Sequence, residues 1–126
     1  MTVWLTRQII LAIHDEQIAE HGGAAGLRES GLLDSALARP LNRAGYGDPD
    51  VVELAALYAI GIARNHPFMD GNKRTAWAAM ATFLDLNGVG FDPDQIEATT
   101  TMLLLAAGEV DDATFTAWVR RHAVID

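Results

Sequence analysis

Apolar residues recur at helical spacing along most of the chain. Isoleucines follow Thr6, a residue type favoured at helix N-caps, and predict a first helix that runs to about Glu20. The same periodicity predicts further helices over about 30–40, 51–63, 75–86, 93–107 and 111–122. About six helices with short connections indicate an all-α bundle.

Several of these helices have a recognisable start. Ser30 can cap the second helix. Asp48-Pro49 and Asp92-Pro93 are expected to open the third and fifth, with aspartate as the N-cap and proline at the first helical position. Gln95 can complete a capping box in the fifth helix. The third helix is therefore predicted to have Asp48 as its N-cap, and the fifth helix Asp92.

Glycine and proline mark the helix ends. Gly22-Gly23 is expected to end the first helix, and Pro40 the second. Leu41 to Pro49 is predicted to be an exposed loop or a short hairpin. Asn87-Gly88 closes the fourth helix, and a short extended piece is expected to follow it up to Phe91. The first five residues are predicted to form an extended lead-in.

Bulk properties fit one compact domain over residues 1–126. Half of the residues are hydrophobic and few are aromatic, which favours close packing of small aliphatic side chains. The chain has no cysteine, which excludes disulfides and thiolate metal sites. Its start does not read as a signal peptide, and no apolar run approaches the roughly 20 residues of a membrane span. A soluble, cytoplasmic protein without a membrane partner is expected.

The net charge of −8 argues against a nucleic-acid binder that relies on phosphate attraction. Lys73 is the single lysine of the chain, and it lies beside Arg74 after a Gly-Asn pair. Arginine can replace lysine throughout a protein simply through genome bias. That explanation accounts for the scarcity of lysine but not for its location.

Positive charge is therefore concentrated at the predicted start of the fourth helix. The first N–H groups of a helix have no intrahelical partner and attract anions. Gly71 permits a sharp turn, Asn72 can donate to a phosphate oxygen, and Lys73 and Arg74 add a point charge and a planar fork. These groups suit a di- or triphosphate. The same four residues would also suit an ordinary turn followed by a solvated face.

Residues just before this turn add further chemistry. His66 can accept a proton from an alcohol, and Asp70 is placed to bind Mg²⁺, which prefers one or two carboxylates plus phosphate oxygens. Phe68 is expected to anchor the loop in the core. Pro67 stiffens the loop and disfavours helical geometry at His66. A base, a metal ligand and a phosphate cradle thus lie within one short connection.

This connection resembles the signature of the Fic/Doc family, specifically its Doc (death-on-curing) toxin branch. The resemblance rests on the stretch His66-Pro67-Phe68-Met69-Asp70-Gly71-Asn72-Lys73-Arg74, in which all positions but Met69 agree. It extends along most of the chain, through Gly22-Gly23, Gly26-Leu27-Arg28, the segment 31–40 and Asn87-Gly88.

The resemblance implies the helical Fic fold and transfer of a group from ATP to a hydroxyl of a target protein. It implies His66 as the base and Asp70 as the Mg²⁺ ligand. Gly71, Asn72 and Arg74 would hold the phosphates, and His66, Lys73 and Arg74 together would form the catalytic set. The segment Leu41 to Gly47 would correspond to the flap that docks the target chain.

Lys73 is a departure from the wider Fic pattern. Adenylylating Fic proteins typically carry a second glycine at this position, which leaves room for the α-phosphate beside the base. In the Doc branch the nucleotide is thought to bind in the reverse sense and to present its γ-phosphate. The resemblance therefore implies a kinase, with a threonine of elongation factor Tu as the target and arrest of translation as the outcome.

Regulation is implied to come from a second protein. The chain has no match to the inhibitory Ser/Thr-x-x-x-Glu-Gly-like motif of self-restrained Fic proteins. A Doc-like toxin would instead be held by an antitoxin, whose disordered tail would fold into a helix in a groove. Leu103 to Leu105 and Trp118 could line that groove, although core packing is the simpler role for them.

Other charged and imidazole side chains give weaker signals. Arg64 lies two residues before His66 and could bind phosphate, or it could simply complement the helix dipole at a C-terminus. His14, His21 and His122 share no metal-ligand spacing. His14, on a helix, is expected to pack or to form a hydrogen bond.

Three hypotheses remain at this point. The first is a Doc-type kinase that uses Mg-ATP. The second is a Fic-type AMP transferase, against which Lys73 argues. The third is a non-catalytic module that binds a partner, against which the intact His66, Asp70 and Arg74 argue.

Overall fold

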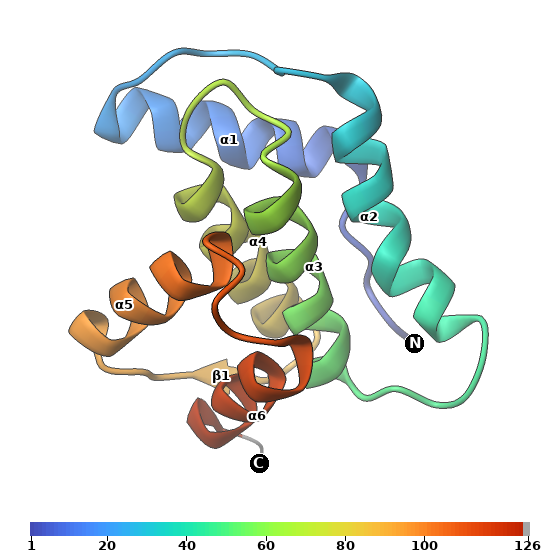
Figure 1. Ribbon diagram of the computed structural model, residues 1–126. Coiled ribbons are helices and arrows are strands. Elements are labelled where there is room, and N and C mark those ends of the chain that lie inside the picture. Colours follow the sequence, from blue (N-terminus) through green and yellow to red (C-terminus); the bar gives the residue numbers. More distant parts are fainter. Residues whose placement is uncertain (125–126) are drawn as a thin grey trace.

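The computed structural model describes residues 1–124. Residues 125 and 126, which the predicted domain includes, lie outside this range. Within it the chain forms six helices and one pair of two-residue strands, which confirms the predicted all-α fold (Figure 1). The elements are α1 Arg7–His21, α2 Ser30–Ala44, α3 Val51–Asn65, α4 Asn72–Leu86, β1 Gly90–Phe91, α5 Gln95–Ala106, α6 Asp112–His122 and β2 Ala123–Val124.

Helix α3 lies at the centre of the bundle, where it packs against α2, α4, α5 and α6 (Figure 1). Most of its residues are buried, on all sides of the helix, as expected for a core helix. The α2–α3 contact is close because Gly61 faces Ala36: a Cβ atom on Gly61 would lie only 3.0 Å from the Cα, Cβ and carbonyl oxygen of Ala36.

The chain ends are tied to this core. The first five residues lie outside any helix or strand, and the N–H of Leu5 donates to the hydroxyl of the buried Tyr58 at 3.1 Å. The predicted extended piece at Phe91 is present: β1 pairs with β2 in antiparallel fashion, Phe91 opposite Ala123. The ring of Phe91 forms an aromatic cluster with those of Trp77 and Trp118. Within residues 1–124, no helix has the length and apolar character that crossing a membrane requires.

Three predicted helix starts were wrong by two or three residues. The N-caps of α3 and α5 are Asp50 and Asp94, the second aspartates of the two Asp-Pro-Asp sequences, whose carboxylates accept the N–H groups of Glu53 and Glu97 at 2.9 Å. Each second aspartate is followed three residues later by a glutamate, which complements the helix dipole. Helix α4 begins at Asn72 rather than near residue 75.

The predicted end of α2 at Pro40 was also wrong. The helix continues to Ala44, and the buried Pro40 lies inside it. The first part of the predicted 41–49 loop is therefore helical. An interior proline removes one backbone hydrogen bond, but the ring is covered by the core, so burial offsets part of that loss.

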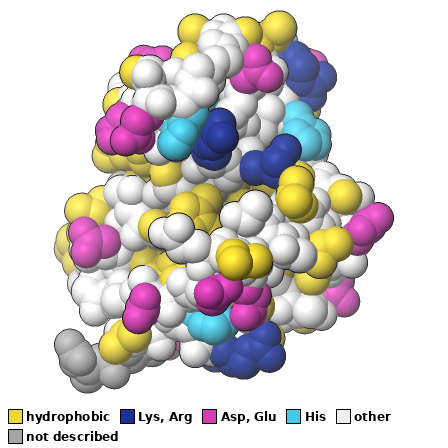
Figure 2. All heavy atoms as spheres, turned by 90° about the vertical axis from the view of Figure 1, so that its left-hand side faces the viewer, with side chains coloured by type: hydrophobic (Ala, Val, Ile, Leu, Met, Phe, Trp, Pro, Cys, Tyr) yellow, Lys and Arg dark blue, Asp and Glu magenta, His cyan; other side chains and the backbone are white. Residues whose placement is uncertain are grey.

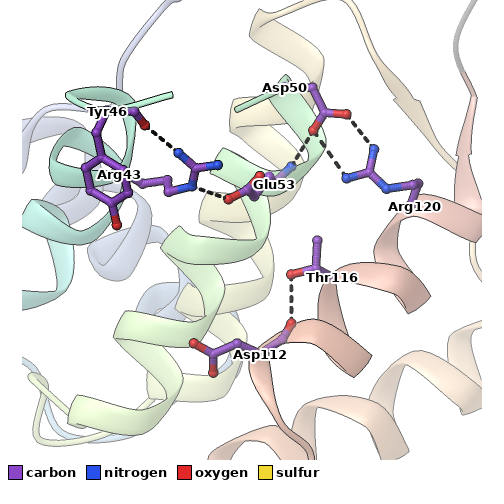
Figure 3. Close-up of polar contacts among 7 residues, drawn as sticks. All are labelled: Arg43, Tyr46, Asp50, Glu53, Asp112, Thr116 and Arg120. Atoms are coloured by element: carbon purple, nitrogen blue, oxygen red, sulfur yellow. Dashed lines mark hydrogen bonds and ion pairs between the residues drawn. The ribbon is translucent and has the colours of Figure 1, made fainter. Parts of the chain in front are cut away.

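Ion pairs surround the start of α3 (Figure 3). Asp50 binds Arg120 of α6, and Glu53 accepts from the Nε atom of Arg43 of α2 at 2.7 Å. The Arg120 guanidinium, through its hydrogen bond to the carboxylate, lowers the pKa of Asp50 below its ordinary value. Three helices are thus joined at one point.

We predict opposite effects of alanine at two helical glycines. Gly61→Ala should lower the free energy of unfolding by about 1–3 kcal/mol, because the new methyl group would force α2 and α3 apart. Gly31→Ala, in α2, meets nothing closer than 4.0 Å and should raise it by about 0.5–1 kcal/mol through helix propensity. The free energy of unfolding of both variants in urea tests the close contact between Gly61 and Ala36. Equal effects of the same sign would contradict it.

A second prediction concerns pH. At pH 7, Asp50→Asn should lower the free energy of unfolding by about 0.5–1 kcal/mol, because asparagine still caps the helix but loses the ion pair. The pKa of Asp50 is lowered on folding, so its contribution is complete above the unfolded value of about 3.9 and is lost as pH falls through the folded value. Urea titrations across pH 2–7 measure this difference. Asp48→Asn, at an exposed residue, is the control. If the difference in unfolding free energy between wild type and Asp50→Asn did not change with pH, the lowered pKa of Asp50 would be contradicted.

Candidate functional site

The candidate site is the connection between α3 and α4, residues 66–71. It lies at one end of the bundle, beside the segment that joins α1 to α2 (Figure 1). Two residues bound it: His66 is the C-cap of α3, and Gly71 is the N-cap of α4. Both have left-handed backbone conformations, which is what allows so short a connection to join the two helices.

His66 is the unusual one of the two. Its φ of 49° makes it the one non-glycine residue with a positive φ in the part of the chain that the structure describes. This conformation costs an ordinary residue about 1–2 kcal/mol. Residues that precede a proline, as His66 does, prefer extended geometry. Pro67 does exclude the right-handed helical conformation here, as predicted, but the backbone takes the left-handed one, so its surroundings must hold it there.

Phe68 anchors the connection, as predicted. Its side chain is 1% exposed and stacks on the imidazole of His14 in α1, with the ring centroids 3.8 Å apart and the planes 6° from parallel. The side chain of Asn72 bonds both backbone groups of Phe68: its Oδ1 accepts the N–H at 2.9 Å and its Nδ2 donates to the carbonyl at 3.0 Å. Asn72 therefore fixes the loop, and one N–H of its amide is left for a ligand.

Asp70 is held from two sides. Its carbonyl oxygen accepts a hydrogen bond from Nε2 of the buried His14 at 2.8 Å, which requires the proton of that imidazole on Nε2. Its Oδ2 accepts the N–H of Ala24 at 2.7 Å. The prediction that His14 packs or forms a hydrogen bond is thus confirmed in both senses. The Oδ1 atom of Asp70 has no hydrogen-bond donor among residues 1–124, and the side chain is exposed.

The segment beside the connection is 26–29, not the predicted 41–47. Leu27 forms a β-bridge with Phe68. The N–H of Arg28 donates to the carbonyl oxygen of Pro67 at 2.7 Å, and the carbonyl oxygen of Gly26 accepts the N–H of Met69 at 3.0 Å. Leu41 to Gly47 instead lies near the first turn of α3, where Arg43 meets Glu53, whereas the connection follows the last turn. The assignment of the flap to 41–47 was therefore wrong.

The start of α4 offers open hydrogen-bond donors. A side-chain oxygen caps α1, α3, α5 and α6, whereas α2 and α4 have no side-chain cap, and of these two only α4 begins with a glycine, Gly71, as its N-cap. Its first N–H groups, on residues 72–74, are left without an intrahelical acceptor. The left-handed φ of Gly71 (78°) is one that glycine adopts without strain. The helix start thus retains the features of an anion site.

Lys73 and Arg74 extend from this helix start into solvent. Neither forms an ion pair with a described residue, although five arginines elsewhere do, namely Arg7, Arg39, Arg43, Arg64 and Arg120. Figure 2 shows basic and histidine side chains gathered on the upper part of one face, above exposed hydrophobic side chains. In a chain with net charge −8, this is a local concentration of unneutralised positive charge.

A groove of about 1020 Å³ runs from this helix start along α4. Gly71, Asn72, Lys73 and Arg74 line one end, and Phe91 and Leu103 are among the residues that line the rest. His66 and Asp70 are exposed but are not part of the lining. Of the residues suggested for a partner groove, Leu103 lines it, whereas Leu105 and Trp118 are buried in the core.

Arg64 does not turn toward the connection. Its guanidinium binds the carboxylate of Asp112 and the carbonyl oxygen of Val110, the latter at 2.6 Å. Both groups belong to the start of α6 and the turn before it, so Arg64 joins α3 to α6. This arrangement favours the structural alternative for Arg64 over a phosphate contact.

The donor set fits a magnesium nucleotide. Among the described residues, no three His, Cys, Asp or Glu side chains lie close enough together to hold a metal ion by themselves. A cation at Asp70 would therefore take most of its oxygens from phosphate and water, which is how Mg²⁺ is usually bound. The open N–H groups of α4 and the two free cations supply the matching contacts for phosphate.

Comparison with known proteins gives concordant matches. A family model described as "Fic/DOC family" matches residues 4–84, which is more than half of the chain. A protein named "Toxin Doc" from Mycolicibacterium smegmatis is 43% identical over 104 residues, 77% of each chain. A protein named "Protein kinase doc" from Escherichia phage P1 is 33% identical over 114 residues, 89% of each chain. Both alignments cover most of the two proteins compared.

Proposed function

The chain belongs to the Fic/DOC family, and on that premise we propose that it is a Doc-type toxin that acts as a protein kinase. The proposed reaction moves the γ-phosphate of ATP to a threonine hydroxyl of a translation factor. The observation that carries the proposal is the stretch 66–74, the connection and the start of α4, in which a base, a carboxylate and an uncapped helix start are held together by contacts to α1 and to segment 26–29. The name of the phage relative supports the reaction class.

In the proposed mechanism, His66 accepts the proton of the threonine hydroxyl. The hydroxyl oxygen forms a bond to the γ-phosphorus as the bond from that phosphorus to the β-phosphate oxygen breaks, and ADP leaves. The N–H groups at the start of α4, Lys73 and Arg74 hold the phosphates and neutralise their charge. Asp70 would hold Mg²⁺, which supplies further neutralisation when it is bound. Such transfer depends mainly on positioning and electrostatics.

Lys73 supports transfer of phosphate over transfer of AMP. AMP-transferring Fic proteins typically carry a glycine at this position, which leaves room for the α-phosphate beside the base, whereas this chain has a lysine. Its exposed position at the first turn of α4, without an ion-pair partner among residues 1–124, leaves the ammonium free for a terminal phosphate.

The proposed target is elongation factor Tu, with arrest of translation in the cytoplasm as the outcome. The target segment is proposed to lie beside 26–29, because this segment already follows the connection in antiparallel fashion. An antitoxin is the proposed partner in regulation. The groove along α4 suits a helical tail, since it joins the basic helix start to apolar side chains such as Phe91 and Leu103.

The test is a transfer assay with γ-labelled ATP, Mg²⁺ and elongation factor Tu. The factor should become labelled, and His66→Ala should lower the rate by about 10²-fold or more, as expected for loss of a general base. His122→Ala, at a histidine that faces Glu97 of α5, is the matched control and should stay within about twofold of wild type.

Two results would overturn the proposal. Label from α-labelled ATP, but not from γ-labelled ATP, would assign AMP transfer instead. No transfer to the factor from either nucleotide, together with normal growth of cells that express the protein without an antitoxin, would leave a binding module as the function.

A further inference from the structure

The backbone conformation of His66 has to be held by contacts from residues outside the connection. Its conformation is disfavoured both because it is left-handed and because Pro67 follows it. The imidazole projects from this residue, so a change of φ at His66 would redirect the side chain. Any group that holds the carbonyls on either side of the residue therefore controls where the proposed base points.

Arg28 is the group that holds those carbonyls. Its Nε donates to the carbonyl oxygen of His66 at 2.9 Å, and its Nη2 donates to that of Asn65 at 3.1 Å. Its own backbone N–H donates to the next carbonyl, that of Pro67, at 2.7 Å. One residue thus binds three consecutive carbonyl groups, and the two that its guanidinium binds, those of residues 65 and 66, belong to the peptide planes on either side of His66.

The charge of Arg28 suits this position. The last carbonyls of a helix carry partial negative charge, and a cation at a helix C-terminus is favourable. Arg28 forms no ion pair with any residue in 1–124, so its guanidinium is committed to these carbonyls. A guanidinium presents several donors in one plane, whereas a lysine ammonium is a single point charge.

The segment that carries Arg28 is tied to the connection through Leu27 and continues into α2, whose start is bound to α3. Leu27 is bridged to Phe68, and the side-chain amide of Asn65 donates to the carbonyl of Leu32 at 3.0 Å. The guanidinium therefore starts from a rigid platform, although the arginine side chain is exposed.

We propose that Arg28 is a positioning residue for His66: its guanidinium, bound to the carbonyls of residues 65 and 66, holds the backbone conformation that directs the imidazole. The proposal rests on the proposed function in one respect, namely that His66 acts as the base. Arg28 itself touches neither nucleotide nor target. It acts through the backbone of His66.

Loss of this contact has a specific consequence. Arg28→Ala should lower kcat for phosphate transfer by about 10- to 100-fold, the size of effect that a displacement of about 1 Å at a reacting group produces. The KM for ATP should stay within about twofold, because the phosphate-binding groups lie on α4. Arg28→Lys keeps the charge but loses the planar set of N–H donors, so its kcat should be only slightly higher than that of Arg28→Ala.

The experiment compares Arg28→Ala and Arg28→Lys with Arg7→Ala in the full chain. Arg7 is a matched control, since its guanidinium also makes two hydrogen bonds next to the same segment, to Asp34 at 2.6 Å and Ser30 at 2.8 Å, but none to the connection. For each variant, kcat and KM are measured, the folded fraction is checked by circular dichroism, and φ at His66 is determined by NMR scalar couplings and NOEs.

The proposal expects φ at His66 to leave the positive region in Arg28→Ala, with the loss in kcat, and to remain positive in Arg7→Ala with wild-type kcat. A positive φ in Arg28→Ala would overturn it. An unchanged kcat, or a rise in KM with kcat unchanged, would overturn it equally. Should wild type transfer no phosphate, the proposed function fails, and φ at His66 alone decides whether Arg28 holds this residue.

Discussion

The burial of Phe68 between α1 and the α3–α4 pair is the interaction on which the site depends. Most of the functional groups in this connection are exposed and polar, so they cannot fix their own positions by packing. Phe68 supplies the fixed point, because its ring is almost fully removed from water and stacks on His14. Burial of such a side chain is worth about 1.5–3 kcal/mol. The hydrogen bonds to Asn72 and Asp70 then extend this order outward.

Electrostatics give this connection its chemical character. The protein is acidic, and most of its arginines are neutralised where they join helices, as at Arg64 and Arg120. Lys73 and Arg74 are left unpaired within the described chain, next to a helix start that has no side-chain cap. An anion near this point would meet open N–H groups and free cations at once. Five arginines thus serve in ion pairs that hold the described structure together, whereas the two cations at this helix start do not.

Helical periodicity was enough to predict the six helices and the connection between α3 and α4, because both depend on local patterns. The errors came where two local signals competed. At Asp48-Pro49-Asp50, both aspartates could cap, and the second is the actual cap, with Glu53 completing the first turn. Pro40 is a strong local stop signal, but its ring is buried in the core and the helix continues past it.

The residues that support the site were harder to predict. His14 and Arg28 reach the connection from positions about 40 to 55 residues earlier in the chain, and no local pattern records which carbonyl a side chain will meet. The same holds for segment 26–29, whose place beside the connection results from the path of the chain between α1 and α2. The residues of the connection itself carry a recognisable signature, whereas their supports are visible only in three dimensions.

The central claim is that this rigid connection brings a base to the terminal phosphate of a nucleotide at the start of α4. A crystal structure of the protein with Mg²⁺ and a non-hydrolysable ATP analogue tests this claim most directly. We predict the γ-phosphate on the N–H groups of residues 72–74, with the His66 imidazole facing it and Asp70 on the metal ion. An imidazole that faces away from the nucleotide, or a nucleotide bound elsewhere on the protein, would contradict the account.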